Sequence, residues 1–491
     1  MNLRLSILTT LTMAGALQAQ VTPPKPYGVL PSDRQLLWHD KEMYVLVHFT
    51  PTTFENKEWG YGDANPSIFN PTQFDARQIV SAVRAGGFKG LILVAKHHDG
   101  FALWPTKTTE YNISKSPFRD GKGDMVKEFS DACRMGGLSF GVYCSPWDRN
   151  SPVYGTPEYV KLYRAQLREL YTQYGPLFMS WHDGANGGDG YYGGARTSRK
   201  IDRSVYYGWD TTWAMTRQLQ PGATIFSDIG WDVRWVGNER GEAAPTSWAT
   251  YTPQPLPGKT KSGPGDVRDE FNPMGTRNGD FWIPAECDVP LRKGWFYHPE
   301  EDSTVKSPER LFNLYLKSVG RGGALDLGIA PDRRGLLHEA DVRSLAAFGD
   351  RLARVFSDDF AKKATLTVTN TRGNDARAFG ASKLTDDDRY SYWATDDANT
   401  EASVELAWNT AQTFDLIRLR ENIRLGQRID SVAIYVYDGK GWTTAGTATS
   451  IGACRLVRFD RSVTTDRLRI RIVSSAVCPA LSEIGVFDSK K

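Results

Sequence analysis

The stretch GLILVAKHHDG, residues 90–100, shows the pattern that decides the fold: an apolar run followed directly by polar, chemically reactive side chains. Such a run predicts a strand of a parallel sheet, because strands that are buried on both faces are apolar throughout. The pattern recurs along the first two thirds of the chain. The predicted strands are Met43–His48, Gly90–Lys96, Ser139–Tyr143, Leu177–Trp181, Ala223–Ser227, Phe281–Ala285 and Ala324–Ile329.

Amphipathic helical patterns lie between these strands. Alternating strands and helices over roughly 300 residues predict an α/β fold, a (β/α)₈-like TIM barrel. A doubly wound open sheet is the alternative. That fold usually carries a Gly-rich phosphate loop after its first strand, and HFTPTTFENKEWG, residues 48–60, is not such a loop. The helical patterns include Asp75–Ala85, Met125–Met135, Pro157–Tyr174 and Thr211–Leu219.

The chain divides into three expected segments. Residues 1–19 are typical of a secretory signal peptide, with Arg4 ahead of an apolar stretch and small residues near Ala19, so we expect an exported protein, periplasmic or secreted. Residues 20–355 carry the barrel pattern and are the expected catalytic domain. Short alternating strands with Gly, Asn and Asp turns predict an antiparallel β-sandwich over residues 356–491. Its predicted strands include Ser403–Trp408, Leu416–Arg420, Leu456–Phe459 and Leu468–Val473.

Composition excludes several classes of partner. The 60 basic and 57 acidic residues nearly balance and form no basic run, so we expect no nucleic-acid partner. No segment after the signal peptide is apolar enough to predict a membrane span. The five cysteines show no CxxC spacing, which argues against a zinc site or a disulfide framework. Cys454 and Cys478 either form a disulfide or remain two buried thiols.

Polar residues close the predicted strands, and in a barrel the active site forms at this end of the strands. Three of the seven histidines close the first two strands. Tryptophans lie close to these polar groups in the sequence, and a sugar suits this mixture because it offers hydroxyl groups and an apolar face. The strand-closing residues are His48, His97, His98, Asp99, Tyr143, Trp181, His182, Asp183 and Asp228, and the tryptophans are Trp59, Trp104, Trp147, Trp181, Trp231 and Trp295.

Hydrolysis of a glycoside needs two carboxyl groups beside the scissile bond. Asp183 follows a predicted strand and precedes Gly184, which leaves its carboxylate accessible. The partner comes from another loop. Glu239 lies among tryptophans that could raise its pKa, and Glu242 and Glu286 are the alternatives.

Two other classes of protein remain open at this point. A metal-dependent hydrolase would use the histidines as ligands, but adjacent residues of a strand point to opposite faces, which weakens that hypothesis. A non-catalytic carbohydrate-binding protein would keep the aromatic residues but would not need paired carboxyl groups at the strand ends.

The chain resembles the α-L-fucosidases of glycoside hydrolase family 29, specifically the branch that removes α-1,3- and α-1,4-linked fucose. The resemblance implies that Asp183 is the nucleophile and Glu239 the acid/base of a retaining exo-glycosidase, that Trp59 and Trp295 line the pocket, and that no cofactor is needed for catalysis. The motifs are HFT (48–50), EWG (58–60), KHHDGF (96–101), SPWDRN (145–150), WHDGANGGDGYYGGA (181–195), VRWVGNE (233–239) and GWFYH (294–298). The implied fucose contacts are His48, Glu58, His97, His98, Tyr143, Trp181 and Arg234.

The resemblance also implies finer properties. The expected substrates are Lewis-type glycans or other fucosylated glycoconjugates, and broad activity that includes α-1,2 linkages is the alternative. Gly187–Gly194 carries Asp189, Tyr191 and Tyr192 and either binds a neighbouring galactose or is a flexible surface loop. The sandwich resembles galactose-binding-like domains, in which Asp386–Asp388 would either hold a structural calcium or form a solvated turn. His182 stands where the family usually has Phe or another apolar residue, and Gly328 stands where Asn is expected.

Overall fold

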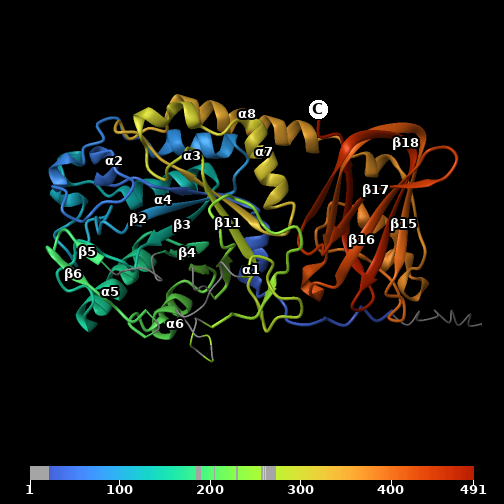
Figure 1. Ribbon diagram of the computed structural model, residues 1–491, viewed down its shortest axis with the longest axis horizontal. Helices are drawn as coiled ribbons and strands as arrows, with labels where there is room; N and C mark the ends of the chain where they lie inside the picture. The colour runs from blue at the N-terminus through green and yellow to red at the C-terminus, as the bar shows by residue number, and fades with distance from the viewer. Residues whose placement is uncertain are drawn as a thin grey trace, which may run out of the picture.

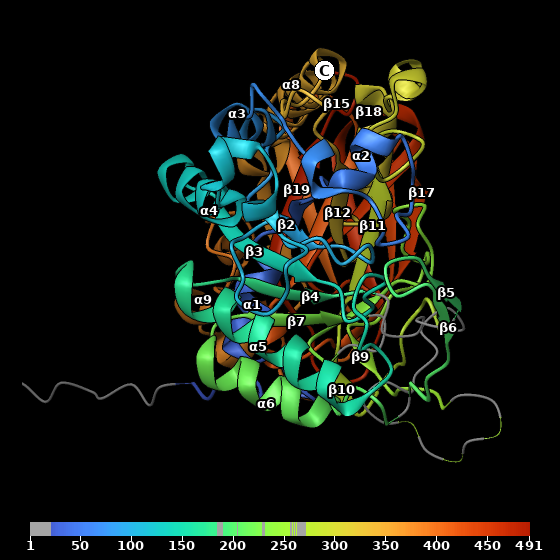
Figure 2. The same ribbon diagram turned by 90° about the vertical axis from the view of Figure 1, so that its left-hand side faces the viewer.

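The computed structural model describes residues 21–183, 190–203, 205–227, 231–255, 258, 260, 262 and 272–491. A helix-covered barrel lies beside a β-sheet domain that ends the chain (Figures 1 and 2). Residues 1–19, Asp189 and Asp228 lie outside the described residues.

Eight parallel strands close the barrel in the order β1-β12-β11-β8-β7-β4-β3-β2, which confirms the predicted architecture. Their side chains alternate between two layers: Val45 and Val47 of β1 pack under the helices, whereas Tyr44 and Leu46 fill the barrel interior. The strands are β1 (Met43–Val47), β2 (Gly90–Lys96), β3 (Ser139–Cys144), β4 (Met179–His182), β7 (Thr224–Ser227), β8 (Val233–Trp235), β11 (Ala285–Pro290) and β12 (Ala324–Ile329).

Two barrel strands differ from the sequence prediction. The predicted strand Phe281–Ala285 is wrong, because Phe281–Trp282 (β10) pairs with Thr250–Tyr251 (β9) in a separate two-stranded sheet. The barrel strand here is β11, whose Glu286 and Asp288 interrupt the apolar pattern although both side chains are buried. The second is β8, a three-residue strand with a buried arginine at its centre, which the sequence pattern did not predict. Apolar periodicity misses both strands because their interior positions are polar.

Six longer helices follow barrel strands, and their ends carry recognisable signals. Asp124 begins α4 by accepting a hydrogen bond from the Lys127 backbone N–H, and Gly137 ends it in the left-handed region. Ser307 begins α7 in the same way as Asp124. These helices are α3 (Ala76–Ala85), α4 (Met125–Gly136), α5 (Pro157–Gln173), α6 (Trp209–Leu219), α7 (Pro308–Lys317) and α8 (Glu339–Phe356), and shorter elements are α1 (Asp33–His39), α2 (Pro51–Glu55), β5 (Gly190–Tyr192) and β6 (Thr197–Arg199).

The C-terminal domain is an antiparallel sheet domain in the order β14-β19-β15-β18-β16-β17, with β13 beside β15. Two of its strands are longer than predicted: β15 joins the predicted pair Ser403–Trp408 and Leu416–Arg420, and β18 joins Leu456–Phe459 and Leu468–Val473. Register shifts along the β15–β18 pair interrupt the pairing where the sequence pattern breaks. The remaining elements are α9 (Ala376–Phe379), β13 (Thr365–Val368), β14 (Trp393–Ala394), β15 (Ala402–Glu421), β16 (Ile429–Tyr437), β17 (Trp442–Thr449), β18 (Arg455–Ser475) and β19 (Ala480–Phe487).

Charged side chains join the two domains. Glu42, just before β1, forms ion pairs with Arg389 at 3.2 Å and Arg420 at 2.7 Å, both from the C-terminal domain. The two guanidinium groups hold the pKa of the Glu42 carboxyl well below its usual range despite burial.

The first described residues form a strap along the C-terminal domain. The Tyr27 backbone N–H donates to the Leu425 carbonyl at 2.9 Å, and Arg428 donates to the Lys25 carbonyl at 2.9 Å, across 403 positions of sequence. The strap therefore tethers the start of the described chain to its last domain.

Of the two alternatives for Asp386–Asp388, a structural calcium site is not supported by the arrangement of the side chains. Asp387 pairs with Lys362, while Asp386 accepts hydrogen bonds from the Ser391 hydroxyl and the Asp388 backbone. In the part of the chain that the structure describes, no three His, Cys, Asp or Glu side chains make a group that could hold a metal ion. All five cysteines are buried free thiols, so Cys454 and Cys478 are not paired. Among the described helices, none has the length and apolar character needed to cross a membrane.

Candidate active site

A cavity of about 480 Å³ opens at the carboxyl ends of the barrel strands. It brings together nine of the eleven residues singled out from the sequence, although they come from six separate stretches of chain. Those nine are His48, Glu58, Trp59, His97, His98, Trp181, Asp183, Glu239 and Trp295, and Leu46, Phe226, Trp235, Asp288, Pro290, Lys293 and Phe296 also line the cavity.

Asp183 lies just past β4, with its side chain 38% exposed. The Tyr143 hydroxyl donates to its Oδ2 atom at 3.1 Å, and His98 Nε2 lies 3.4 Å from the same oxygen. Tyr143 is therefore not part of the cavity lining, but it is hydrogen-bonded to Asp183, which is. A carboxylate that is accessible and already held by a hydroxyl group is suited to attack carbon.

Glu239 follows β8 and faces the same cavity. Its Oε2 atom accepts a hydrogen bond from Trp295 Nε1 at 3.3 Å. Burial raises the pKa of the Glu239 carboxyl, and the negative charges of Asp183 and Glu58 raise it further. The raised pKa favours the protonated form that a general acid needs.

The two alternative carboxyl groups have other roles. Glu242 pairs with Lys317 of α7 at 2.9 Å and does not line the cavity. Glu286 is fully buried and accepts a hydrogen bond from Trp181 Nε1 at 2.7 Å and another from the Tyr44 hydroxyl. Neither is placed to protonate a leaving group in the cavity.

Histidines 48 and 97 are neutral bases at the cavity wall. Burial lowers the pKa of His48 to about 3 and that of His97 well below its usual value. Their Nδ1 atoms are buried and have no hydrogen-bond partner among the described residues. A neutral imidazole at the cavity wall can donate to or accept from a sugar hydroxyl group, and because both Nδ1 atoms are buried, Nε2 is the atom available to do so.

Glu58 holds one wall of the cavity in place through hydrogen bonds. Its carboxylate accepts hydrogen bonds from the Trp295 and Phe296 backbone N–H groups and lies 2.9 Å from His298 Nε2. These contacts position the loop that carries Trp295. The Trp295 ring in turn packs on Gly328, where a Cβ atom would lie 2.5 Å from the ring. The glycine thus makes room for Trp295, a reason that the sequence alone did not reveal.

A second loop is held by Asp99, which closes the second barrel strand. Its carboxylate accepts hydrogen bonds from the Thr50 hydroxyl at 2.8 Å and the Thr52 hydroxyl at 3.1 Å. Burial raises the Asp99 pKa to about 6. Asp99 therefore positions His97 and His98 against the first loop and does not face the cavity.

Arg234, like Tyr143, lies outside the cavity lining, unlike the other predicted fucose contacts. It is fully buried, donates to the Pro273 carbonyl at 3.2 Å and lies over the Tyr251 ring. Its contact with fucose stays a prediction. Of the remaining tryptophans, Trp104 donates to Glu169 in the helix layer and Trp231 packs on Trp213.

Trp59 of the cavity wall is exposed, as are Tyr61, two residues further along the chain, and Tyr191. Trp59 is 53% exposed, Tyr61 45% and Tyr191 50%, and the Tyr61 and Tyr191 ring centres lie 6.5 Å apart. Tyr192 differs, because it is buried and accepts a hydrogen bond from Trp147 Nε1 at 2.8 Å. Of the two tyrosines in the predicted galactose-binding loop, only Tyr191 is therefore accessible.

A parallel barrel whose mouth combines an accessible carboxylate, a carboxyl group of raised pKa and aromatic walls is the arrangement of a glycoside hydrolase. The family model described as alpha-L-fucosidase matches residues 27–355. The chain therefore belongs to the α-L-fucosidase family, and its activity is hydrolysis of α-L-fucosides.

Individual relatives agree with this assignment. The chain is 37% identical to alpha-L-fucosidase 1 of Arabidopsis thaliana over 470 residues, which cover 95% of this chain and 89% of that one. It is similar to the crystal structure of a putative alpha-L-fucosidase from Bacteroides thetaiotaomicron (TM-score 0.85, 37% identity, 95% and 99% covered). It is also similar to a Ruminococcus gnavus GH29 fucosidase in complex with fucose (TM-score 0.84, 28% identity, 96% and 97% covered).

Proposed function

We propose that this α-L-fucosidase acts by double displacement with retention, with Asp183 as nucleophile and Glu239 as acid/base. Asp183 attacks the anomeric carbon while the glycosidic C–O bond breaks, and Glu239 gives its proton to the leaving oxygen. Glu239 then takes a proton from water, whose oxygen attacks the same carbon and releases Asp183. The placement of both carboxyl groups on one cavity, where burial raises the pKa of Glu239, carries this proposal.

Proton NMR of the first product tests the stereochemistry. An α-L-fucoside substrate should release α-L-fucose before mutarotation. Early appearance of β-L-fucose would show inversion and would contradict a covalent intermediate on Asp183.

The proposed substrates are α-1,3- and α-1,4-linked fucosides of branched, Lewis-type glycans. Trp59, Tyr61 and Tyr191 support this proposal. Trp59 lines the cavity, Tyr61 follows it by two residues and lies against Tyr191, and all three rings are exposed, so a neighbouring sugar ring could stack on them. Binding energy from a non-reacting ring can orient the scissile bond, so substrates without that ring should lose kcat as well as affinity.

Three substrates separate this restricted specificity from broad activity. A Lewis trisaccharide should have a higher kcat/KM than its galactose-free disaccharide and 2′-fucosyllactose. Tyr191→Ala should lower kcat/KM on the trisaccharide alone. Equal kcat/KM on all three would favour the broad enzyme that also cleaves α-1,2 linkages.

We also propose that residues 1–19 direct export and that residues 20–355 and 356–491 are the catalytic and galactose-binding-like domains of the mature protein. The pattern of Arg4, an apolar stretch and small residues near Ala19 supports export. Mass spectrometry of the protein from its native host should find the N-terminus close to residue 20. An intact Met1 on the mature protein would contradict export by cleavage.

A further inference from the structure

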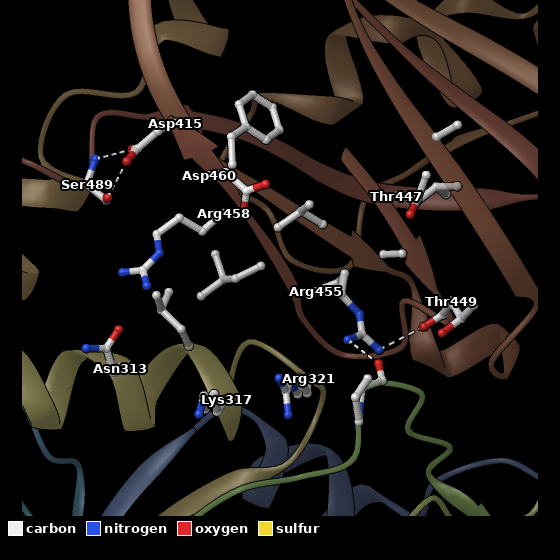
Figure 3. Close-up of a pocket in the computed structure, with 18 of the residues that line it drawn as sticks. Asn313, Lys317, Arg321, Asp415, Thr447, Thr449, Arg455, Arg458, Asp460 and Ser489 are labelled. Atoms are coloured by element: carbon white, nitrogen blue, oxygen red, sulfur yellow. Dashed lines mark hydrogen bonds between the residues drawn. The ribbon is translucent and has the colours of Figure 1, made fainter. Parts of the chain in front are cut away.

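A second, larger cavity lies between α7 of the barrel and the β16-β17-β18 part of the C-terminal domain (Figure 3). Its volume is about 1050 Å³, and it shares no lining residue with the active-site cavity. Binding sites for small molecules usually measure about 300–1,000 Å³, so this groove has room for several sugar rings.

The groove is basic. Two of its three carboxyl groups are already engaged: Glu309 pairs with Arg351, and Asp415 accepts hydrogen bonds from the Ser489 backbone N–H and hydroxyl at 2.7 Å each. The cationic lining residues are Lys317, Arg321, Arg351, Arg455, Arg458 and Lys490, and the anionic ones are Glu309, Asp415 and Asp460.

Arg455 places a buried charge at one end of the groove. It is 4% exposed, and its acceptors among the described residues are all neutral: the carbonyl groups of Pro245, Thr449 and Ser450 and the Ser450 hydroxyl, at 2.8–2.9 Å. Figure 3 shows the bond to Thr449. Burial lowers the Arg455 pKa to about 10, and the neighbouring charge of Arg321 lowers it further. Four of the five guanidinium N–H groups are thus occupied, so Arg455 contributes positive charge to this end of the groove but few free donors.

Two further guanidinium groups face the same space. Arg321 forms a backbone bridge with Arg455 and donates to the Ala243 carbonyl, while the Glu242 carboxylate beside it is taken by Lys317. Arg458 is exposed and extends from β18 toward α7 (Figure 3). Planar guanidinium groups bind sulfate and carboxylate oxygens in pairs of hydrogen bonds.

We propose that this groove is a second glycan-binding site, in which Arg321 and Arg458 bind an oxyanion, a sulfate ester or a carboxylate, of an acidic oligosaccharide, and the buried charge of Arg455 attracts it. The neutral lining supports a sugar: the Asn313 amide and the Ser431, Thr447 and Thr449 hydroxyl groups are partners for sugar hydroxyls. A second site on the same chain raises the effective concentration of a polymeric glycan at the active site. An acidic peptide is the competing ligand.

Calorimetry on the full chain tests this site with probes that lack fucose: lactose 3′-sulfate, 3′-sialyllactose, lactose, inorganic sulfate and an acidic hexapeptide. At least one charged sugar should bind ~10-fold more tightly than lactose, the equivalent of one charge-assisted hydrogen bond. Which charged sugar binds more tightly distinguishes the sulfate ester from the carboxylate. The affinity should fall as salt rises.

Two variants carry the same change of charge at different places. Arg458→Gln should weaken binding of the charged sugar by ~3–10-fold, because it removes one exposed cation of the groove. Arg461→Gln, an exposed position of β18 outside the lining, should leave binding unchanged. Arg321→Gln/Arg458→Gln should weaken it further, with thermal unfolding as the check of folding. Hydrolysis of an aryl fucoside should stay unchanged in Arg458→Gln, so this test is independent of the catalytic assignment.

Four results would overturn the proposal. They are equal affinity for lactose and both charged sugars, equal losses in Arg458→Gln and Arg461→Gln, inorganic sulfate binding as tightly as lactose 3′-sulfate, and tighter binding of the acidic hexapeptide than of any sugar.

Discussion

Carboxyl groups lie at two depths in the mouth of the barrel, and they differ in what can reach them. Asp183 and Glu239 line the cavity, where substrate and water have access. Glu286 is fully buried and is occupied by hydrogen bonds from Trp181 and Tyr44. Burial raises the pKa of Glu239 and raises that of Glu286 to about 7. A raised pKa alone therefore does not identify the reacting acid. Glu239 combines it with access to the cavity, which Glu286 lacks, while Asp288 at the cavity wall accepts a hydrogen bond from Trp235 Nε1 at 2.8 Å.

Loss of the nucleophile should have the largest effect. Asp183→Ala should lower kcat on an aryl α-L-fucoside roughly 10⁴-fold or more, as removal of a covalent nucleophile does in other hydrolases. Glu242→Ala is the matched control, because it removes a carboxylate that pairs with Lys317 outside the cavity. Its kcat should stay close to that of the wild type. Steady-state kinetics would reject the assignment if Asp183→Ala kept a tenth of the wild-type kcat.

Loss of the acid/base should have the second-largest effect on activity. Glu239→Ala should lower kcat/KM by about 10²–10⁴-fold on an oligosaccharide, whose leaving group needs a proton. On an aryl fucoside with a good leaving group the loss should be smaller, and azide should restore activity.

The pH profile sharpens this assignment. Because Glu239 acts in its protonated form and its pKa is raised, wild-type kcat/KM should fall on the alkaline side as this carboxyl loses its proton. Glu239→Ala should lose that limb of the profile. The buried Glu286 would instead be the acid if Glu286→Gln, and not Glu239→Ala, showed azide rescue.

The buried carboxyl group of Glu286 should affect how the free energy of unfolding depends on pH. The Glu286 pKa is about 7 in the folded protein, against an ordinary value of 4.5, so the folded state keeps a proton that the unfolded chain has lost between these pH values. Glu286 therefore stabilises the fold most below about pH 4.5, and the free energy of unfolding should fall by up to ~1.4 kcal/mol per pH unit toward pH 7.

Urea unfolding between pH 4 and pH 8 measures this slope. Glu286→Gln should flatten it in part, since buried Asp288 and Asp326, whose pKa values are also raised, remain. Below about pH 4.5, where Glu286 adds no pH-dependent cost, the variant should lose about 1 kcal/mol because the glutamine amide replaces one of the two oxygens that Trp181 and Tyr44 contact. Identical slopes in both proteins would mean that Glu286 does not bind the extra proton.

Substitution of His182, the residue before the nucleophile, should have the smallest effect on kcat. His182 is buried, lies 2.6 Å from the Tyr163 hydroxyl and 3.0 Å from the Ser180 hydroxyl, and has a pKa lowered to about 3 by burial. His182→Phe removes these contacts but no charge. It should destabilise the protein by about 1–2 kcal/mol and change kcat less than threefold. A drop in kcat like that of Asp183→Ala would show that His182 takes part in the chemistry.

Most of the barrel was predictable because its strands are apolar and close on polar residues, as GLILVAKHHDG does. The site was predictable for the same reason, since strand ends meet at one edge. β8 and β11 were not, because Arg234, Glu286 and Asp288 sit at interior positions where periodicity expects apolar side chains. The roles of Glu58 and Gly328 also depend on distant loops, which no local pattern records.

The strap between the N-terminal segment and the C-terminal domain bears on the order in which the protein is built. Lys25 is among the first described residues to be synthesised. The hydrogen bond that its carbonyl accepts from Arg428 cannot form until the chain has grown by another 403 residues. Contacts of such separation form late, because the chain between them must first be ordered. The barrel strands can thus pair while the chain is still being synthesised. The contacts between the N-terminal strap and the C-terminal domain form only after that domain has folded.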